Sequence, residues 1–182
     1  MRMTRTRYLL ALIGAILLAA CGDATAAETT ATTETEPSES SIEVTAVDFG
    51  FENLPERISA GTTLTLVNES PVELHELVAI RLPEDETRTV EELMASPEDL
   101  AAYFPSVTTV VIAPPGEDGV AVEGTGRLDA PGRYAIICAI PTGADPAEYM
   151  EAVAEAEGGP PEVAGGPPHF AHGMYAEVTV EG

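Results

Sequence analysis

The chain has 182 residues, with 31 acidic residues against 8 arginines and no lysine, so its formal net charge at pH 7 is −23. This length fits one domain with appended segments, because domains commonly contain about 100–150 residues. So acidic a chain is poorly suited to binding nucleic acid or to adhering to anionic lipid by charge, and basic partners are favoured instead. Solubility or a salty habitat is an alternative reason for the acidity.

Residues 1–20 are predicted to be a lipoprotein signal peptide. A basic segment with three arginines, an apolar run over residues 8–18 and a group of small residues follow one another, which is the layout of an export signal. The apolar run is shorter than the ~20 residues that span a bilayer. The sequence LAACG at residues 18–22 resembles the lipobox of bacterial lipoproteins, which implies lipidation of Cys21 after cleavage before it. A plain signal peptide or an uncleaved anchor is the alternative.

Residues 21–40 are expected to form a lipidated, disordered tether. After Cys21 this segment contains mainly Thr, Glu, Ser and Ala, with almost nothing apolar to bury. A flexible coil of this length spans on the order of 25 Å. Removal of the signal leaves 5 arginines against 31 acidic residues, or −26. We therefore expect residues 41–182 to form a domain outside the cytoplasm, anchored by lipid to the cell membrane.

From residue 42 onward the chain has the pattern of an all-β protein. Apolar residues alternate with polar ones at 42–46 and again at 62–67, with turn sequences on both sides of the second run. Further apolar segments are predicted to be strands at residues 72–82, 107–113, 120–128, 132–139 and 174–180. About seven or eight short strands separated by turns are typical of an antiparallel β-sandwich.

Two helical insertions are expected to interrupt these strands. Two capping-box sequences, TVEE and SPED, predict a helix pair over residues 89–104. The second insertion covers residues 140–168, between Cys138 and His169, and a helix is predicted to begin in it at Asp145-Pro146, to run through Glu155 and to end at two glycines. Loops this long usually carry function or are disordered, and the capped helix favours an ordered insertion.

Cys138 is the first candidate for chemistry. The chain has two cysteines, so lipidation of Cys21 would leave Cys138 without a disulfide partner in the chain. A lone cysteine in an oxidising compartment is buried and inert, is paired with another chain, or binds a metal. The rest of the chain's chemistry decides among these alternatives.

The three histidines of the chain favour a metal site. His169 and His172 lie close to Met174 at the start of the last predicted strand, and His75 follows a predicted turn. A soft thiolate, two imidazoles and a weakly bound thioether are the ligands of a type 1 copper centre. Cys138 and these residues could therefore bind one copper ion.

The sequence around these residues resembles that of the cupredoxins, and of plastocyanin-like members in particular. Residues 168–174 (PHFAHGM), followed by a strand, are similar to the family segment P-H-x-x-x-G-M. Residues 131–138 (PGRYAIIC) are similar to the P-G-x-Y-x-x-x-C strand that precedes it, and residues 68–75 resemble the turn that carries the first histidine. The resemblance covers residues 42–182 and implies a Greek-key β-sandwich of the cupredoxin type with two short helical insertions.

The resemblance also implies the roles of individual residues. His75 and His169 would be imidazole ligands, Cys138 the thiolate and Met174 the axial ligand of a single mononuclear type 1 copper ion. His172 is the rival of His169, but the H-x4-M spacing of the family favours His169.

The sequence departs from the family pattern in two places. Thirty residues separate Cys138 from His169, where the family has only a few, so the two ends of the insertion must return to the same place. Glu76 follows His75 where plastocyanin-like proteins have Asn, and a carboxylate there is expected to lower the reduction potential.

We therefore expect an extracytoplasmic, membrane-anchored carrier of single electrons and not an enzyme, since no catalytic triad or substrate-binding motif is visible. Its expected partners are a redox protein with a basic docking patch and the membrane, through the lipid on Cys21. Copper storage or delivery, and a metal-free cupredoxin-like interaction domain, are the alternatives. A binuclear copper centre is excluded because it requires two cysteines in one loop.

Overall fold

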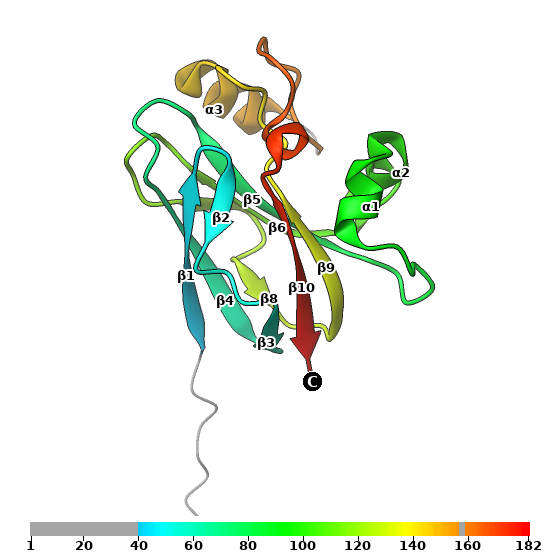
Figure 1. Cartoon of the computed structure of the whole chain (residues 1–182). Coiled ribbons are helices and arrows are strands. Elements are labelled where there is room, and N and C mark those ends of the chain that lie inside the picture. Colours follow the sequence, from blue (N-terminus) through cyan, green and yellow to red (C-terminus); the bar gives the residue numbers. More distant parts are fainter. Residues whose placement is uncertain (1–39, 157–158) are drawn as a thin grey trace, which may run out of the picture. The chain divides into compact units, whose positions relative to one another are not determined.

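The computed structural model describes residues 40–156 and 159–182, so the predicted signal peptide and nearly all of the predicted tether lie outside the described residues. The described domain has two β-sheets with short helices at one end and on one face (Figure 1). The strands are β1 (Ser41–Val47), β2 (Gly50–Glu52), β3 (Arg57–Ser59), β4 (Thr62–Asn68), β5 (His75–Arg81), β6 (Val107–Ala113), β7 (Val120–Glu123), β8 (Arg127–Leu128), β9 (Gly132–Ile137) and β10 (Tyr175–Glu181).

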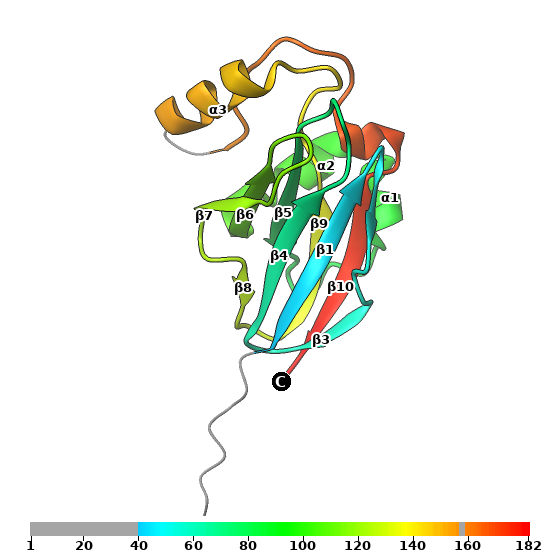
Figure 2. The same cartoon turned by 90° about the vertical axis from the view of Figure 1, so that its left-hand side faces the viewer.

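The two sheets pack face to face, and the strand order is β2-β1-β4-β8 in one and β3-β10-β9-β5-β6-β7 in the other (Figure 2). The all-β sandwich with short helical insertions is therefore confirmed. Most strand pairs are antiparallel, as expected, but β1 pairs with β4 and β3 pairs with β10 in parallel. Between β1 and β4 the chain forms β2 and then β3, which belongs to the opposite sheet, and it returns to the first sheet in its original direction.

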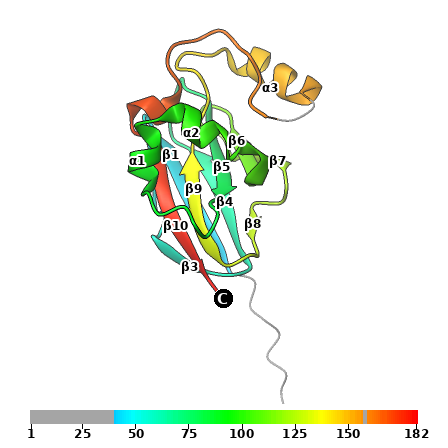
Figure 3. The same ribbon diagram turned by 90° about the vertical axis from the view of Figure 1, so that its right-hand side faces the viewer.

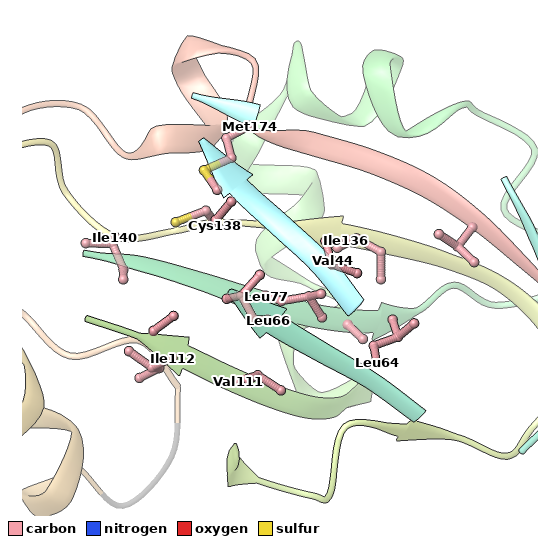
Figure 4. Packing of buried hydrophobic residues seen from close by; sticks show 14 of the residues in the cluster. Val44, Leu64, Leu66, Leu77, Val111, Ile112, Ile136, Cys138, Ile140 and Met174 are labelled. Carbon is pink, nitrogen blue, oxygen red and sulfur yellow. The ribbon is translucent and has the colours of Figure 1, made fainter. Parts of the chain in front are cut away.

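The core lies between the sheets and follows from the alternation of side chains along the strands. In β4, Leu64 and Leu66 are buried while the residues between them are more exposed. They pack with Val44 of β1 and with Leu77 and Ile136 of the other sheet (Figure 4). This alternating burial fixes the register of the strands, since a shift by one residue would expose every core side chain.

The first insertion covers the outer face of the six-stranded sheet (Figure 3). It contains α1 (Val90–Met94), α2 (Pro97–Ala101) and the 3-10 turn η1 (Phe104–Ser106). Val90, Leu93 and Leu100 are buried against the strands, which explains why successive residues of β5 and β9 are buried on both faces of the sheet.

The capping sequences of the first insertion behave differently. Thr89 forms the predicted capping box: its hydroxyl accepts a hydrogen bond from the Glu92 amide at 3.2 Å, and its own amide donates to the Glu92 carboxylate at 2.8 Å. Ser96 makes no side-chain cap hydrogen bond, so the second predicted capping box is wrong. Its backbone ψ of 73° departs from the extended value of Thr89, which places its hydroxyl differently.

The second insertion carries α3 (Pro146–Glu155), whose N-cap Asp145 accepts hydrogen bonds from the amides of Ala147 and Glu148, both at 3.0 Å. The helix ends at Glu155, before the predicted glycines. The ends of the insertion pair with each other: Pro141 forms a bridge with Pro168. Among the described residues, no helix is long and apolar enough to cross a membrane.

Candidate metal centre

Three of the predicted ligands converge at one end of the sandwich. His75 begins β5, Cys138 follows β9 directly, and His169 begins the 3-10 turn η2 (His169–His172). All three are fully buried, and their ligand atoms lie within 4.8 Å of one another. The two Nδ1 atoms are 3.1 Å apart, and the Cys138 Sγ lies 3.3 Å from the Nδ1 of His169. The sequence prediction that these residues share a site agrees with this arrangement, while their role as metal ligands stays a prediction.

The turn before β5 is held in place by Asn68. Its buried side-chain amide donates to the carbonyl oxygens of Glu73 at 2.8 Å and Ala113 at 2.9 Å, and its carbonyl oxygen accepts from the Ser70 amide at 2.9 Å. These bonds join the turn to the end of β6, which pairs with β5 opposite His75. The position of His75 is therefore determined by a buried polar network, and such networks are rigid when every member is satisfied.

Backbone hydrogen bonds bring His169 back to Cys138 despite the intervening insertion. The amide of His169 donates to the Ile140 carbonyl at 3.0 Å, and the amide of Phe170 donates to the Cys138 carbonyl at 2.9 Å. Beyond them the Thr142 amide donates to the Pro167 carbonyl at 3.1 Å. The insertion thus leaves and returns as a paired ribbon, as the sequence required.

Met174 lies at the same buried end. Its side chain is fully buried, its amide donates to the His169 carbonyl at 3.2 Å, and its carbonyl accepts from the Cys138 amide at 3.2 Å. Figure 4 shows the Met174 and Cys138 side chains at this end of the core. Gly173, with a φ of 104° that favours glycine, makes the turn between η2 and Met174.

His172 does not join the buried cluster. It is exposed, and its ring stacks on Phe49 with a centroid distance of 5.0 Å and an interplanar angle of 30°. The ring of Phe49 also lies 4.7 Å from that of His169. Of the two rival histidines, His169 is therefore the one placed beside Cys138, and His172 lies at the surface behind Phe49.

Each candidate ligand histidine has its second ring nitrogen near a carboxylate that the sequence analysis did not predict. The Nε2 of His75 is 3.1 Å from the Oδ1 of Asp48, and the Nε2 of His169 is 3.3 Å from the Oε2 of Glu73. The second contact does not have the geometry of a hydrogen bond, and the His169 Nε2 has no hydrogen-bond partner among the described residues. No local pattern marks Asp48, whereas the proximity of Glu73 to His75 in the sequence was a usable signal.

Burial determines the protonation of the three residues. Burial lowers the pKa of His75, although Asp48 opposes this, and burial with the charge of His75 lowers the pKa of His169 to about 4. Both rings are therefore neutral at pH 7, which is the form that binds a metal. Burial, together with the charge of Glu76, raises the pKa of Cys138 well above its ordinary value. A metal must therefore displace a proton from this thiol when it binds.

Glu76 connects the centre to the second insertion. Its amide donates to the Cys138 Sγ at 3.4 Å, and its carboxylate accepts from the Ala139 amide at 3.0 Å and from the Tyr149 hydroxyl at 3.2 Å. Burial raises the pKa of Glu76 to about 7. The carboxylate therefore faces Ala139 and α3, and its predicted effect on a reduction potential stays a prediction.

The donor set fits copper better than zinc. A structural zinc site has four strong ligands in a tetrahedron, whereas the cluster found among the described residues has one thiol and two imidazoles. The fourth candidate is the thioether of Met174, a soft and weak ligand of the kind that type 1 copper accepts at a long axial distance.

Similarity to known proteins is found among solved structures. No family model matches the chain, and no curated protein matches its sequence. Among solved structures, auracyanin B is similar with 20% identity and a TM-score of 0.43, covering 81% of this chain and 92% of its own.

Two further auracyanins are similar to the same extent. Reduced auracyanin of Roseiflexus castenholzii has 19% identity and a TM-score of 0.43, covering 79% of this chain and 98% of its own. Auracyanin A of Chloroflexus aurantiacus, a "blue" copper protein, has 20% identity and a TM-score of 0.40, covering 78% of this chain and 98% of its own.

Proposed function

We propose that this protein is an extracytoplasmic, lipid-anchored carrier of single electrons with one type 1 copper ion. His75, His169 and Cys138 would bind the copper, with Met174 as the axial ligand. The observation that carries the proposal is the convergence of two Nδ1 atoms and one thiol sulfur in a fully buried site. When bound, the copper would supply a one-electron redox couple.

The surroundings of the site favour electron transfer over catalysis. The three ligands are fully buried, so a substrate has no open position at which to reach the metal. Strand pairing and backbone hydrogen bonds on both sides of Cys138 and His169 hold the ligands in place. A centre that keeps its geometry in both oxidation states transfers electrons with little rearrangement. Phe49 and the exposed His172 offer a short path from His169 to the surface.

The position of Ser41, where the predicted tether would join the domain, supports a docking role for the metal end. β1 begins at Ser41 and ends at Val47, directly before Asp48, which lies beside His75. Seven residues of strand span about 20 Å at ~3.3 Å per residue. The metal centre therefore lies at the end of the domain away from residue 41, where a redox partner with a basic docking patch could approach the acidic protein.

Copper addition tests this proposal. Cu(II) added to the chain without its signal peptide is expected to produce an intense blue thiolate-to-copper absorption band. Cys138→Ser should abolish the band and His75→Ala should weaken it, whereas His172→Ala, which changes an exposed histidine, is the matched control and should retain it. A wild-type protein that stays colourless with a reactive Cys138 would contradict the proposal.

The anchor needs its own experiment because it depends on the lipobox resemblance. Labelled fatty acid is expected to be incorporated into the full chain, and Cys21→Ser should prevent incorporation and release the protein from the membrane fraction. Membrane retention of the unlabelled Cys21→Ser protein would instead indicate an uncleaved anchor.

A further inference from the structure

Each of the two candidate ligand histidines has a carboxylate oxygen close to its Nε2, the ring nitrogen that is not part of the Nδ1 contact between them. Asp48 follows the end of β1 in the four-stranded sheet, and Glu73 lies in the turn before β5 of the six-stranded sheet. Their oxygens lie 3.1 Å from the Nε2 of His75 and 3.3 Å from the Nε2 of His169. Two separate parts of the chain thus place the same chemical group behind the two rings.

We propose that Asp48 is a positioning residue that holds a proton on the Nε2 of His75, and that Asp48 and Glu73 together stabilise Cu(II) relative to Cu(I). The part of this inference that concerns copper rests on the proposed function. The part that concerns the proton does not, because it describes the metal-free protein.

The positioning role follows from the tautomers of imidazole. A neutral ring has one N–H, and the other nitrogen is free to bind a metal. An ionised carboxylate only accepts hydrogen bonds, so Asp48, 3.1 Å from the Nε2 of His75, favours the tautomer of that ring with the proton on Nε2. The Nδ1 of His75 is then left as a base, and it faces the Nδ1 of His169 at 3.1 Å.

Glu73 is itself held by the second insertion. Its Oε2, the atom next to His169, also accepts a hydrogen bond from the Gly143 amide at 3.0 Å. Its backbone carbonyl accepts from the Asn68 side chain at 2.8 Å. The carboxylate is thus fixed from both sides, and its side chain is only 15% exposed.

The charge effect follows from counting charges at the centre. Two neutral imidazoles and one thiolate give a formal charge of +1 with Cu(II) and zero with Cu(I). Nearby negative carboxylates stabilise the more positive state, and they do so more strongly where burial lowers the effective dielectric constant. The side chain of Asp48 is 39% exposed and that of Glu73 15%, so Glu73 should have the larger effect. The two carboxylates should therefore lower the reduction potential.

Two isosteric variants test the charge effect. Asp48→Asn and Glu73→Gln remove the charge and keep an oxygen that can accept a hydrogen bond. Both variants are expected to keep the blue band. Glu73→Gln should raise the ratio of Cu(I) to Cu(II) affinity about tenfold, which is about 59 mV for a one-electron couple, and Asp48→Asn should raise it by less because solvent screens the more exposed carboxylate. The measurement is a redox titration that follows the band at one pH.

Glu43→Gln is the matched control for charge. Glu43 is exposed on β1, five residues before Asp48 and about 16 Å away along the strand. Glu43→Gln should leave the ratio of Cu(I) to Cu(II) affinity unchanged. If Asp48→Asn and Glu73→Gln shift the titration no more than Glu43→Gln does, the charge effect is refuted.

Imidazole ¹⁵N chemical shifts of the metal-free protein test the positioning role without copper. In the wild type, His75 should show a protonated Nε2, and Asp48→Ala should introduce the Nδ1-protonated form of this ring. A wild-type His75 protonated on Nδ1, or an unchanged tautomer in Asp48→Ala, would overturn the positioning role. A protein that shows this tautomer of His75 but binds no copper would refute the proposed function and leave the positioning role standing.

Discussion

The two helical insertions both bury apolar side chains, but their polar contacts end in different places. The first buries Val90, Leu93 and Leu100 against the outer face of the six-stranded sheet, and Arg133 binds the backbone just before it. The second buries Ile140, Ala144 and Tyr149 in the core and also forms hydrogen bonds to residues beside the candidate metal centre, from Tyr149 to Glu76 and from Gly143 to Glu73.

Because of this difference, the first insertion is expected to affect only the stability of the fold, and the second is expected to affect the candidate metal centre as well. Apolar burial contributes free energy without specifying where a particular atom lies, so the first insertion is expected to stabilise the fold. Hydrogen bonds to Glu76 and Glu73 are directional and end on residues that contact the candidate ligands. The second insertion is therefore expected to affect the properties of the centre as well as stability.

The largest effect on stability is expected from a substitution that creates a cavity beneath the first insertion. Leu93 is fully buried, and Leu93→Ala should lower the free energy of unfolding by about 2–5 kcal/mol, through lost burial and an unfilled cavity. Urea unfolding measures this change, and the blue band of the folded, copper-loaded variant should match that of the wild type. The exposed Glu91→Ala is the control and should change stability by less than about 0.5 kcal/mol. A blue band altered by Leu93→Ala would contradict the expectation that the first insertion affects only stability.

A smaller loss of stability, with a spectral change, is expected in the second insertion. Tyr149→Phe removes the hydroxyl that donates to the buried Glu76 carboxylate, at a cost of about 1–3 kcal/mol. Because Glu76 also contacts Cys138 through its amide, the copper band or the reduction potential should shift as well.

Tyr103→Phe is the matched variant in the first insertion, since the Tyr103 hydroxyl donates to Glu86 at 2.6 Å. This substitution also removes a tyrosine hydroxyl that donates to a glutamate, but this glutamate lies away from the candidate ligands. The copper absorption spectrum should therefore not change. Equal spectra for Tyr149→Phe and Tyr103→Phe would show that the second insertion does not influence the centre.

The smallest effect on stability is expected from the loss of the salt bridge between Arg133 and Glu177 beside the first insertion. Arg133 pairs with Glu177 at 2.9 Å and donates to the backbone carbonyls of Glu86 and Arg88, both at 2.6 Å. The Arg133 guanidinium lowers the pKa of Glu177. Glu177→Gln should cost less than about 1 kcal/mol at pH 7, because the pair is partly exposed to solvent.

The contribution of this salt bridge to stability should decrease as the pH falls. A carboxylate whose pKa is lower in the folded state binds fewer protons there, so its contribution is complete at neutral pH and disappears as the pH falls through the acid range. The difference in unfolding free energy between wild type and Glu177→Gln should therefore shrink with acidification. A difference that stays constant from pH 7 down to the acid range would contradict this assignment.

Local patterns were sufficient to predict most strands and one of the two capping boxes. Alternation in β1 and β4 reports which face is buried, because successive side chains of a strand point to opposite faces. The capping box at Thr89 involves residues three apart, so its chemistry is visible in the sequence. Ser96 has the same pattern without the bond, because its backbone conformation depends on the turn that packs α1 against α2.

The sequence by itself determined the donor set of the candidate centre and the need for the insertion to return, since ligand types, their order and their spacing are properties of the chain. Only the tertiary structure decided that His169 and not His172 lies beside Cys138, and that Asp48 and Glu73 lie behind the ligand rings. It also placed Tyr149 on Glu76, 73 residues away in the chain. The physical reason is that these contacts join different sheets and insertions, so they exist only after the sandwich has packed and the ends of the second insertion have paired.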